Sequence, residues 1–268
     1  MDNKLDFSAV RELLESELEK GCFPGAALSV VSKNEVLYRT HLGSAQLEPE
    51  QRKMKADTIF GLASLTKVIV TTSSIMKLVE MGRINIYDYI KEYFPELPEA
   101  KEEITIFHLL THSSGYQAIV KLWDQEMDYQ QKIKYILELP LENEVGELVN
   151  YSDPNFILLG ELVQRVSGSS LQEFSQQHFF SPLGMDNTAY KPLANLNADQ
   201  SCIAATEYCS WRKKMIVGEV HDENAYSLGE ISGHAGLFSN NEDLSKFVMM
   251  LLNNGRYQEQ SIFSPLTI

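Results

Sequence analysis

The feature that most constrains this chain is a series of four segments, between residues 104 and 184, whose apolar residues recur at helical spacing. These segments are 104–115, 129–140, 154–168 and 171–184. A fifth segment, the apolar stretch 65–81, contains Lys67 and Lys77, so it predicts a buried helix and not a membrane span. The middle of the chain, about 61–200, is therefore predicted to be helical.

Strand-like patterns lie on both sides of this helical region. They occur, in order, at 26–34, 35–45, 202–208 and 213–220, and a helical pattern follows at 241–255. The first two patterns predict a β-hairpin. We therefore expect one α/β domain of the α+β type over 1–268, in which 1–60 and the C-terminal part form a sheet region beside the helices.

The charge balance narrows the set of partners. The chain has 23 Lys and Arg against 37 Asp and Glu, and so acidic a surface repels nucleic acid and anionic lipid. The first 20 residues form a Glu-rich amphipathic pattern unlike a secretory signal. We therefore expect a cytoplasmic protein, with an exported chain whose signal has been removed as the alternative. Three cysteines without CxxC spacing argue against disulfides and against a thiolate zinc site.

Ser64-Leu-Thr-Lys67 places a serine and a lysine three residues apart at the predicted start of a helix. Residues at this spacing share one helix face, so Lys67 can reach the Ser64 hydroxyl. A serine hydroxyl needs a neighbour that accepts its proton before it attacks a carbonyl, and N–H groups at a helix start can bind the resulting oxyanion. The competing interpretation is a helix-capping serine followed by a solvated lysine.

Further motifs make the Ser-x-x-Lys pattern more specific. Four features occur in order: Phe60-Gly-Leu-Ala-Ser-Leu-Thr-Lys67, Ile104-Thr-Ile-Phe-His-Leu-Leu-Thr-His-Ser-Ser-Gly115, Tyr151-Ser-Asp153 and Leu158-Leu-Gly160. Together they resemble the serine β-lactamase-related family, which includes class C β-lactamases, penicillin-binding proteins, D-Ala-D-Ala carboxypeptidases and related esterases. The resemblance implies a β-lactamase/transpeptidase-like fold.

The resemblance also implies roles for individual residues. Ser64 is the implied nucleophile, Lys67 and Tyr151 are its proton-transfer partners, and Asp153 bonds the lysine or the substrate amide. Class C enzymes have Asn where Asp153 stands. A carboxylate there favours the charged form of Lys67, which makes Tyr151 the main base. Asp153 followed by Pro154 also fits a helix N-cap and first turn, and Pro154 disfavours the class A Ser-Asp-Asn register.

The family's third motif is Lys-Thr-Gly or His-x-Gly on an edge strand. The literal match is His234-Ala-Gly236, which makes His234 a candidate substrate-binding residue. Its surroundings, however, resemble an earlier family segment that leads into a helix. On this interpretation the C-terminal strands of the family fold are missing, and we expect an exposed sheet edge, poor solubility and weak turnover.

Histidines at 108 and 112 have a spacing that can bind zinc on one helix face. The Glu of an HExxH motif does not stand between them, and such a pair is more often structural, so no metal site is expected. No cofactor is implied either, because the sequence has neither a dinucleotide glycine fingerprint nor a phosphate-binding loop.

The leading hypothesis is a serine hydrolase that forms an acyl-enzyme on Ser64 and hydrolyses a peptide, ester or β-lactam carbonyl of a small-molecule or peptide substrate. D-Ala-D-Ala-type peptidase or small-ester hydrolase ranks first, and β-lactamase second. The alternative is a non-catalytic binding or regulatory relative with an incomplete active site. A zinc hydrolase built on His108 and His112 ranks third. No oligomeric state is predicted.

Overall fold

The computed structural model describes residues 5–196 and 198–268. Their contacts divide the chain into two compact units. The first unit contains residues 5–61, 179–219 and 238–268, and the second contains 62–178 and 220–237. Every residue that the sequence singled out for chemistry lies in the second unit. No helix among the described residues combines the length and the apolar character needed to cross a bilayer.

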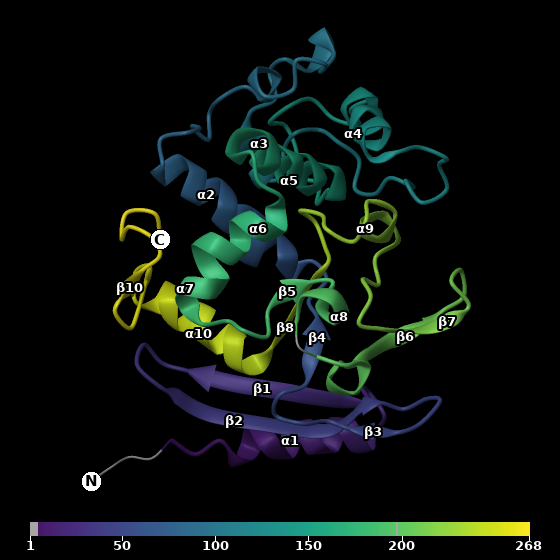
Figure 1. Ribbon diagram of the computed structural model, residues 1–268, viewed down its shortest axis with the longest axis vertical. Coiled ribbons are helices and arrows are strands. Elements are labelled where there is room, and N and C mark those ends of the chain that lie inside the picture. The colour runs from purple at the N-terminus through teal and green to yellow at the C-terminus, as the bar shows by residue number, and fades with distance from the viewer. Residues whose placement is uncertain (1–4, 197) are drawn as a thin grey trace. The chain divides into compact units, whose positions relative to one another are not determined.

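The first unit is built on an antiparallel hairpin, as the sequence predicted. The sheet has the order β1–β2–β3, with β1 (Gly25–Val31), β2 (Val36–Gln46) and β3 (Arg52–Lys53). Helix α1 (Ser8–Glu19) packs on β2 and helix α10 (Asn241–Leu252) packs on β1, so a helix covers each face of the hairpin (Figure 1). Strand β1 is an edge strand of this sheet.

Shorter strands and helices complete the first unit. They are β4 (Ile59–Gly61), α7 (Ser181–Leu183), β5 (Ala189–Tyr190), α8 (Pro192–Asn195), η5 (Gln200–Cys202), β6 (Ala205–Cys209), β7 (Lys214–Val217), β8 (Leu237–Asn240), β9 (Arg256–Tyr257) and β10 (Gln260–Ser261). Strand β8 lies between β4 and β5, and β6 and β7, which lie within the two predicted strand segments 202–208 and 213–220, pair with each other. A buried apolar cluster is formed by Ile59 of β4, Phe238 of β8 and Ile203.

The second unit is helical, and helices form within the predicted helical segments. Its helices are η1 (Lys67–Thr72), α2 (Ser73–Glu80), η2 (Ile90–Glu92), η3 (Glu99–Lys101), α3 (Ile106–Leu110), α4 (Tyr129–Glu138), α5 (Asp153–Ser167), α6 (Leu171–Ser175) and α9 (Glu223–Ser227), and η4 (Gln176–Phe180) continues from α6. Helix α5 contacts η1, α2, α3, α4 and α6 and is therefore the centre of this unit.

Helix α5 is buried on all sides from Pro154 to Val163, as expected for a helix whose neighbours surround it. Its N-cap is Ser152, which has an extended backbone, and Gly168 ends the helix in the left-handed region with φ 74°. The interpretation of Asp153 as the N-cap was therefore wrong by one residue. Asp153 is already helical, and its carboxylate binds Lys67 instead of capping the helix.

The predicted regular helix over 65–81 is instead divided into a π-helical segment, η1, followed by α2. Thr72 Oγ1 donates to the Lys67 carbonyl at 2.9 Å, and Ser73 Oγ donates to the Val68 carbonyl at 3.2 Å. These hydroxyls bond carbonyls five residues earlier, the spacing at which a π-helix also forms its backbone bonds. Apolar periodicity alone did not reveal this wider turn.

The segment 232–237 approaches helix α5 more closely than any side chain would allow. A Cβ atom at Gly233 would lie 2.1 Å from the Phe156 carbonyl oxygen, and one at Gly160 would lie 2.9 Å from the Gly233 nitrogen. Both distances are far below van der Waals contact. Two glycines facing each other therefore fix the distance between this segment and α5.

We predict that Gly233→Ala lowers the free energy of unfolding by more than about 2 kcal/mol, because the backbone must move to relieve the overlap. Urea unfolding followed by circular dichroism measures the change. Gly82→Ala is the matched control: Gly82 has φ 66° but open space around it, so we expect a loss of only about 1 kcal/mol. Equal losses in the two variants would contradict the close-approach argument.

Candidate active site

Ser64 is exposed and lies immediately before the helical stretch that contains η1. Ala63, the residue before it, has φ 45°, a conformation that costs a non-glycine residue strain and that recurs at functional turns. The Leu62 N–H donates to the Leu237 carbonyl at 2.8 Å and anchors this turn. Among residues 5–196 and 198–268 no acceptor is found for the Ser64 N–H, which leaves it free for a substrate oxygen.

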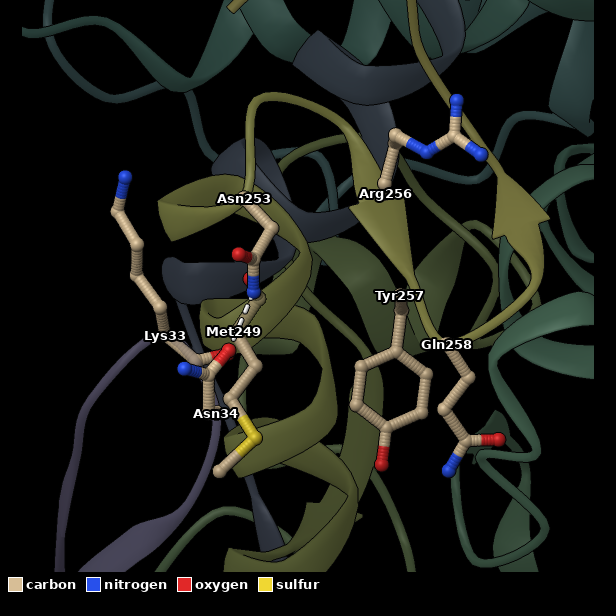
Figure 2. A pocket seen from close by; sticks show the side chains of 7 residues that line it. All are labelled: Lys33, Asn34, Met249, Asn253, Arg256, Tyr257 and Gln258. Atoms are coloured by element: carbon tan, nitrogen blue, oxygen red, sulfur yellow. Dashed lines mark hydrogen bonds between the residues drawn. The ribbon is translucent and has the colours of Figure 1, made fainter.

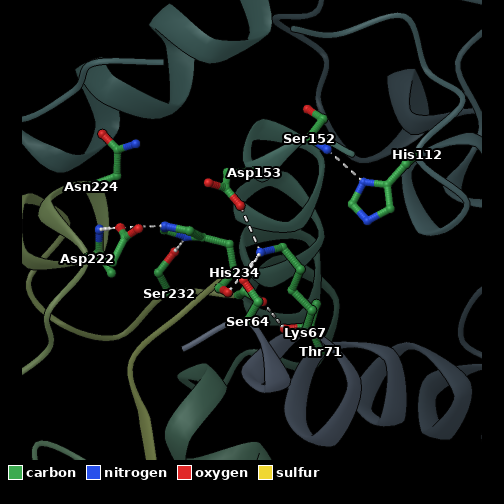
Figure 3. A network of polar contacts seen from close by, with 12 residues as sticks. Ser64, Lys67, Thr71, His112, Ser152, Asp153, Asp222, Asn224, Ser232 and His234 are labelled. Carbon is green, nitrogen blue, oxygen red and sulfur yellow. Dashed lines mark hydrogen bonds and ion pairs between the residues drawn. The ribbon is translucent and has the colours of Figure 1, made fainter. Parts of the chain in front are cut away.

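Lys67 is the centre of the site. Its side chain is only 3% exposed, and its Nζ contacts three oxygens: Ser64 Oγ at 3.1 Å, the His234 carbonyl at 3.1 Å and Asp153 Oδ1 at 2.7 Å (Figure 3). An ammonium group has three N–H donors and no acceptor. The three oxygens therefore satisfy the ammonium form of Lys67 completely.

The helical segment η1 also holds the backbone that contributes the His234 carbonyl. Thr71 Oγ1 donates to the Gly233 carbonyl at 2.6 Å, and the Leu237 N–H donates to Thr66 Oγ1 at 3.1 Å. The side chains of Thr66, which caps η1, and of Thr71 within η1 thus bond both ends of a short segment. The His234 carbonyl is thereby held over the Lys67 ammonium group.

Tyr151 lies beside Lys67, but its ring makes the contact. The Lys67 Nζ is 4.8 Å from the centroid of the Tyr151 ring, a cation–π distance. The Tyr151 side chain is 53% exposed, and its hydroxyl has no hydrogen-bond partner among the residues that the structure describes. The structure therefore brings Ser64, Lys67, Tyr151 and Asp153 together, and about half of Tyr151 is exposed.

The His112 ring packs on the ring of Tyr151. The two ring centroids are 4.5 Å apart, and the His112 ring also packs 5.0 Å from that of Phe156. His112 Nδ1 accepts the Ser152 N–H at 3.0 Å (Figure 3). Burial lowers the pKa of His112 below its ordinary value of 6.5, and the positive charge of Lys67 lowers it further.

A second polar group, formed by Ser232, His234 and Asp222, adjoins the Lys67 site (Figure 3). Burial raises the pKa of Asp222, but the hydrogen bond and charge of His234 outweigh it, and the pKa falls from 3.8 to about 2. Asp222 is therefore ionised and accepts from His234 Nε2 at 2.8 Å. His234 Nδ1 lies 2.8 Å from Ser232 Oγ, so a second hydrogen bond holds the ring.

His234 is thus buried, with 1% of its side chain exposed, and both ring nitrogens are engaged within the protein. Its role in substrate binding stays a prediction. The contact that the structure gives it with the Ser64 region is through its main-chain carbonyl, which accepts from Lys67.

One group of side chains has the donor atoms for a metal ion: oxygens of Asp153 and Asp222 and a ring nitrogen of His234 lie within 4.8 Å of one another. The Lys67 ammonium binds one of these donors at 2.7 Å. A divalent cation in the same place would be repelled by that positive charge. Lys67 is therefore the cation that this group of residues accommodates.

The zinc hypothesis for His108 and His112 depended on a shared helix face, and this expectation was wrong. Helix α3 ends at Leu110, and His112 has φ 57°, outside the helix. The His108 ring instead completes a capping box with Thr105. The two imidazoles thus serve different backbone segments.

The first unit has a surface pocket of about 440 Å³ between the β1–β2 turn and the β9 region. It is lined by Lys33, Asn34, Met249, Asn253, Arg256, Tyr257 and Gln258. Figure 2 shows the Lys33 and Arg256 side chains pointing in different directions, so their charges do not converge on one ligand. The pocket therefore does not gather charged side chains around one point, as the site around Lys67 does.

Fold and site together define a class of protein: an α+β chain in which an exposed serine precedes a buried lysine by three residues, beside a Tyr-x-Asp motif. The model of the Beta-lactamase family matches residues 10–267. The chain belongs to this family, and the resemblance inferred from the sequence is confirmed.

Two curated relatives support the assignment. "N-acetylmuramyl-L-alanine amidase" of Bacillus subtilis (strain 168) is 32% identical over 292 residues, which cover 96% of this chain and 65% of the relative. "Putative D-alanyl-D-alanine carboxypeptidase" of Escherichia coli (strain K12) is 31% identical over 278 residues, which cover 92% and 64%. The chain spans slightly less than two thirds of the length of these relatives.

Solved structures confirm the expected β-lactamase/transpeptidase-like fold. The octameric penicillin-binding protein homologue from Pyrococcus abyssi has a TM-score of 0.78 at 22% identity, covering 98% of this chain and 59% of that chain. The penicillin binding protein from Bacillus halodurans has a TM-score of 0.72 at 24% identity, covering 95% and 76%. At these identities the likeness is one of fold.

Sequence reasoning missed Asp222 and the contact of His112 with Ser152. Asp222 belongs to no motif that was recognised, and its local signal is that of a helix N-cap, since its carboxylate accepts the Ala225 N–H of α9. His112 was noticed only as a metal candidate. In both cases the informative partner is more than ten residues away, where periodicity carries no signal.

We predict that Asp222 contributes stability that is lost in acid. Its folded-state pKa, about 2, lies below its ordinary value of 3.8, so the contribution is fully present above about pH 4 and disappears as the pH falls towards 2. It is worth at most about 2 kcal/mol, because the side chain is partly solvated. Asp222→Asn should therefore show less loss of stability between pH 4 and 2 in urea titrations; an unchanged slope would contradict this.

We also predict that zinc does not bind stoichiometrically to the wild-type group of Asp153, Asp222 and His234, because Lys67 already supplies the positive charge. Isothermal titration with zinc chloride measures binding. Lys67→Ala removes the ammonium and should create a saturable site from the same three donors. Stoichiometric zinc on the wild-type protein would refute the electrostatic argument.

Proposed function

We propose that this protein is a serine hydrolase that acts through an acyl-enzyme on Ser64, with a peptide-type amide as the preferred substrate class. The observation that carries the proposal is the Lys67 contact set: a buried ammonium 3.1 Å from the Oγ of an exposed serine. The names of the two curated relatives, an amidase and a carboxypeptidase, support an amide or peptide bond over an ester or a β-lactam.

In the proposed reaction Tyr151 accepts the Ser64 proton. Lys67 is fully occupied as a donor, so it serves as a fixed positive charge that stabilises the deprotonated Tyr151 and orients Ser64 Oγ. This division of roles follows from the carboxylate of Asp153, which holds Lys67 in its charged form. The half-exposed position of Tyr151 suits a group that exchanges protons with a substrate.

Ser64 Oγ bonds to the substrate carbonyl carbon while its proton passes to Tyr151, and the Ser64 N–H supports the oxyanion. The tetrahedral intermediate collapses by breaking the bond to the leaving amine, which takes the proton from Tyr151. Water then attacks the acyl-enzyme, gives a proton to Tyr151, and the Ser64 oxygen regains that proton as the carboxylic acid leaves.

We predict that a fluorophosphonate probe forms one covalent adduct on the wild-type protein and none on Ser64→Ala, because the activated hydroxyl is removed. Intact-protein mass spectrometry detects the adduct. Ser261→Ala, which changes an exposed serine in β10, is the matched control and should be labelled like wild type.

Hydrolysis assays with a D-alanyl-D-alanine peptide, a penicillin and a p-nitrophenyl ester compare the substrate classes. We expect the peptide to be hydrolysed faster than the penicillin and the ester. Absence of any Ser64 adduct from every reagent would refute the proposed function and favour a non-catalytic binding relative.

A further inference from the structure

The ring of Tyr151 contacts Lys67, but the Tyr151 side chain is half-exposed. Packing therefore holds it only in part, and hydrogen bonds to the neighbouring backbone must fix its position. Both residues beside it bond to His112. The Asn150 N–H donates to the His112 carbonyl at 2.8 Å, and the Ser152 N–H donates to His112 Nδ1 at 3.0 Å. One residue therefore holds the backbone on both sides of Tyr151.

The His112 ring also packs on Tyr151 itself, with centroids 4.5 Å apart. The same ring also packs against Phe156 of α5, with the ring centroids 5.0 Å apart. The ring is thereby fixed between the tyrosine and the central helix of the unit. Rotation of His112 would disturb the aromatic packing and the Ser152 hydrogen bond together.

The backbone of His112 is itself preset for this position. Its φ of 57° turns the chain directly after α3, so that the carbonyl and the ring of one residue both face the 150–152 segment. Further bonds tie the same segment to the loop after α3: Ser152 Oγ donates to the Gln117 carbonyl at 2.8 Å, and the Asp153 N–H to the Ala118 carbonyl at 2.9 Å. His112 is the one member of this set with an ionisable acceptor.

From this geometry we infer that His112 is a positioning residue, which holds Tyr151 against Lys67 by bonding the backbone on both sides of it and packing on its ring. This inference rests on the proposed function, in which Tyr151 accepts the Ser64 proton. No contact between His112 and Ser64 is found among the described residues, so His112 acts through Tyr151.

The bond to Ser152 requires an unprotonated Nδ1, since a protonated imidazole has two donors and no acceptor. The charged groups that face His112 are Lys67 of η1, which disfavours protonation, and Asp153 of α5, which favours it. Burial adds to the effect of Lys67, so the pKa of His112 lies below 6.5. Protonation of Nδ1 would break the bond and release the Tyr151 segment.

Two variants separate the two contacts. His112→Phe keeps an aromatic ring but has no acceptor, which leaves the N–H of the buried Ser152 unpaired. His112→Asn offers an amide oxygen in place of Nδ1, tolerates the left-handed backbone and does not titrate. His108→Gln is the control, because glutamine preserves the capping box with Thr105 on the same helix.

The experiment measures the second-order rate of Ser64 labelling by a fluorophosphonate between pH 5 and pH 8. At pH 7.5 we expect His112→Phe to react at least about tenfold more slowly than wild type, and His112→Asn within about threefold of it. The ratio of wild-type to His112→Asn rates should fall at least about threefold as the pH passes below the point at which the Ser152 amide resonance of wild type titrates, because only wild type loses the Ser152 bond. His108→Gln should match wild type throughout.

A folded His112→Phe variant that reacts as fast as wild type, or a rate ratio that is constant with pH, would overturn the inference. If His112→Phe does not fold, the His112→Asn ratio alone decides. If wild type is not labelled at all, the proposed function fails, and the Ser152 amide resonance decides the positioning role. That resonance should titrate below pH 6.5 in wild type and not in His112→Asn; identical behaviour in both would overturn it.

Discussion

The buried ammonium of Lys67 is the interaction on which the rest of this site depends. A charged group with 3% exposure is tolerated only when its hydrogen-bonding capacity is met, and here three oxygens from three separate segments meet it. The segments are the turn at Ser64, the start of α5 at Asp153, and the backbone at His234. Since each must reach the same nitrogen, Lys67 fixes their mutual positions. The facing glycines of α5 and the 232–237 segment make that approach sterically feasible.

The carboxylate at position 153 sets the charge balance around Ser64. It pairs with Lys67, while Asp222 pairs with the ring of His234, so two negative groups adjoin one permanent positive group. Burial lowers the pKa of the neighbouring His112, and the positive charge of Lys67 lowers it further, which suits the bond that His112 accepts from the Ser152 N–H. In the proposed mechanism, this leaves Tyr151 as the group that moves the proton.

The sequence predicted much of the fold because its signals are local. The hairpin, the strands β6 and β7 and the helices α3 to α6 all follow from apolar periodicity and turn residues. The errors lie where a local pattern permits more than one backbone. The apolar residues of 65–81 fit a regular helix and a helix with a π-helical start equally well. The sequence likewise allows His112 either to extend α3 or to lie beyond its end. Side-chain bonds from Thr72 and Ser73, and a left-handed turn at His112, decided these cases.

The sequence by itself determined the family, the helical unit and the Ser-x-x-Lys pair, because residues three apart on a helix meet whatever surrounds them. It also identified Tyr151 and Asp153 as partners, through their resemblance to a known motif. Only the tertiary structure decided that Lys67 binds Asp153 and the His234 carbonyl, that Asp222 belongs beside them, and that His112 supports Tyr151. These contacts join residues 12 to 167 positions apart. No periodicity encodes such pairs, since they form only when the packing of α5 against its neighbours brings the segments together.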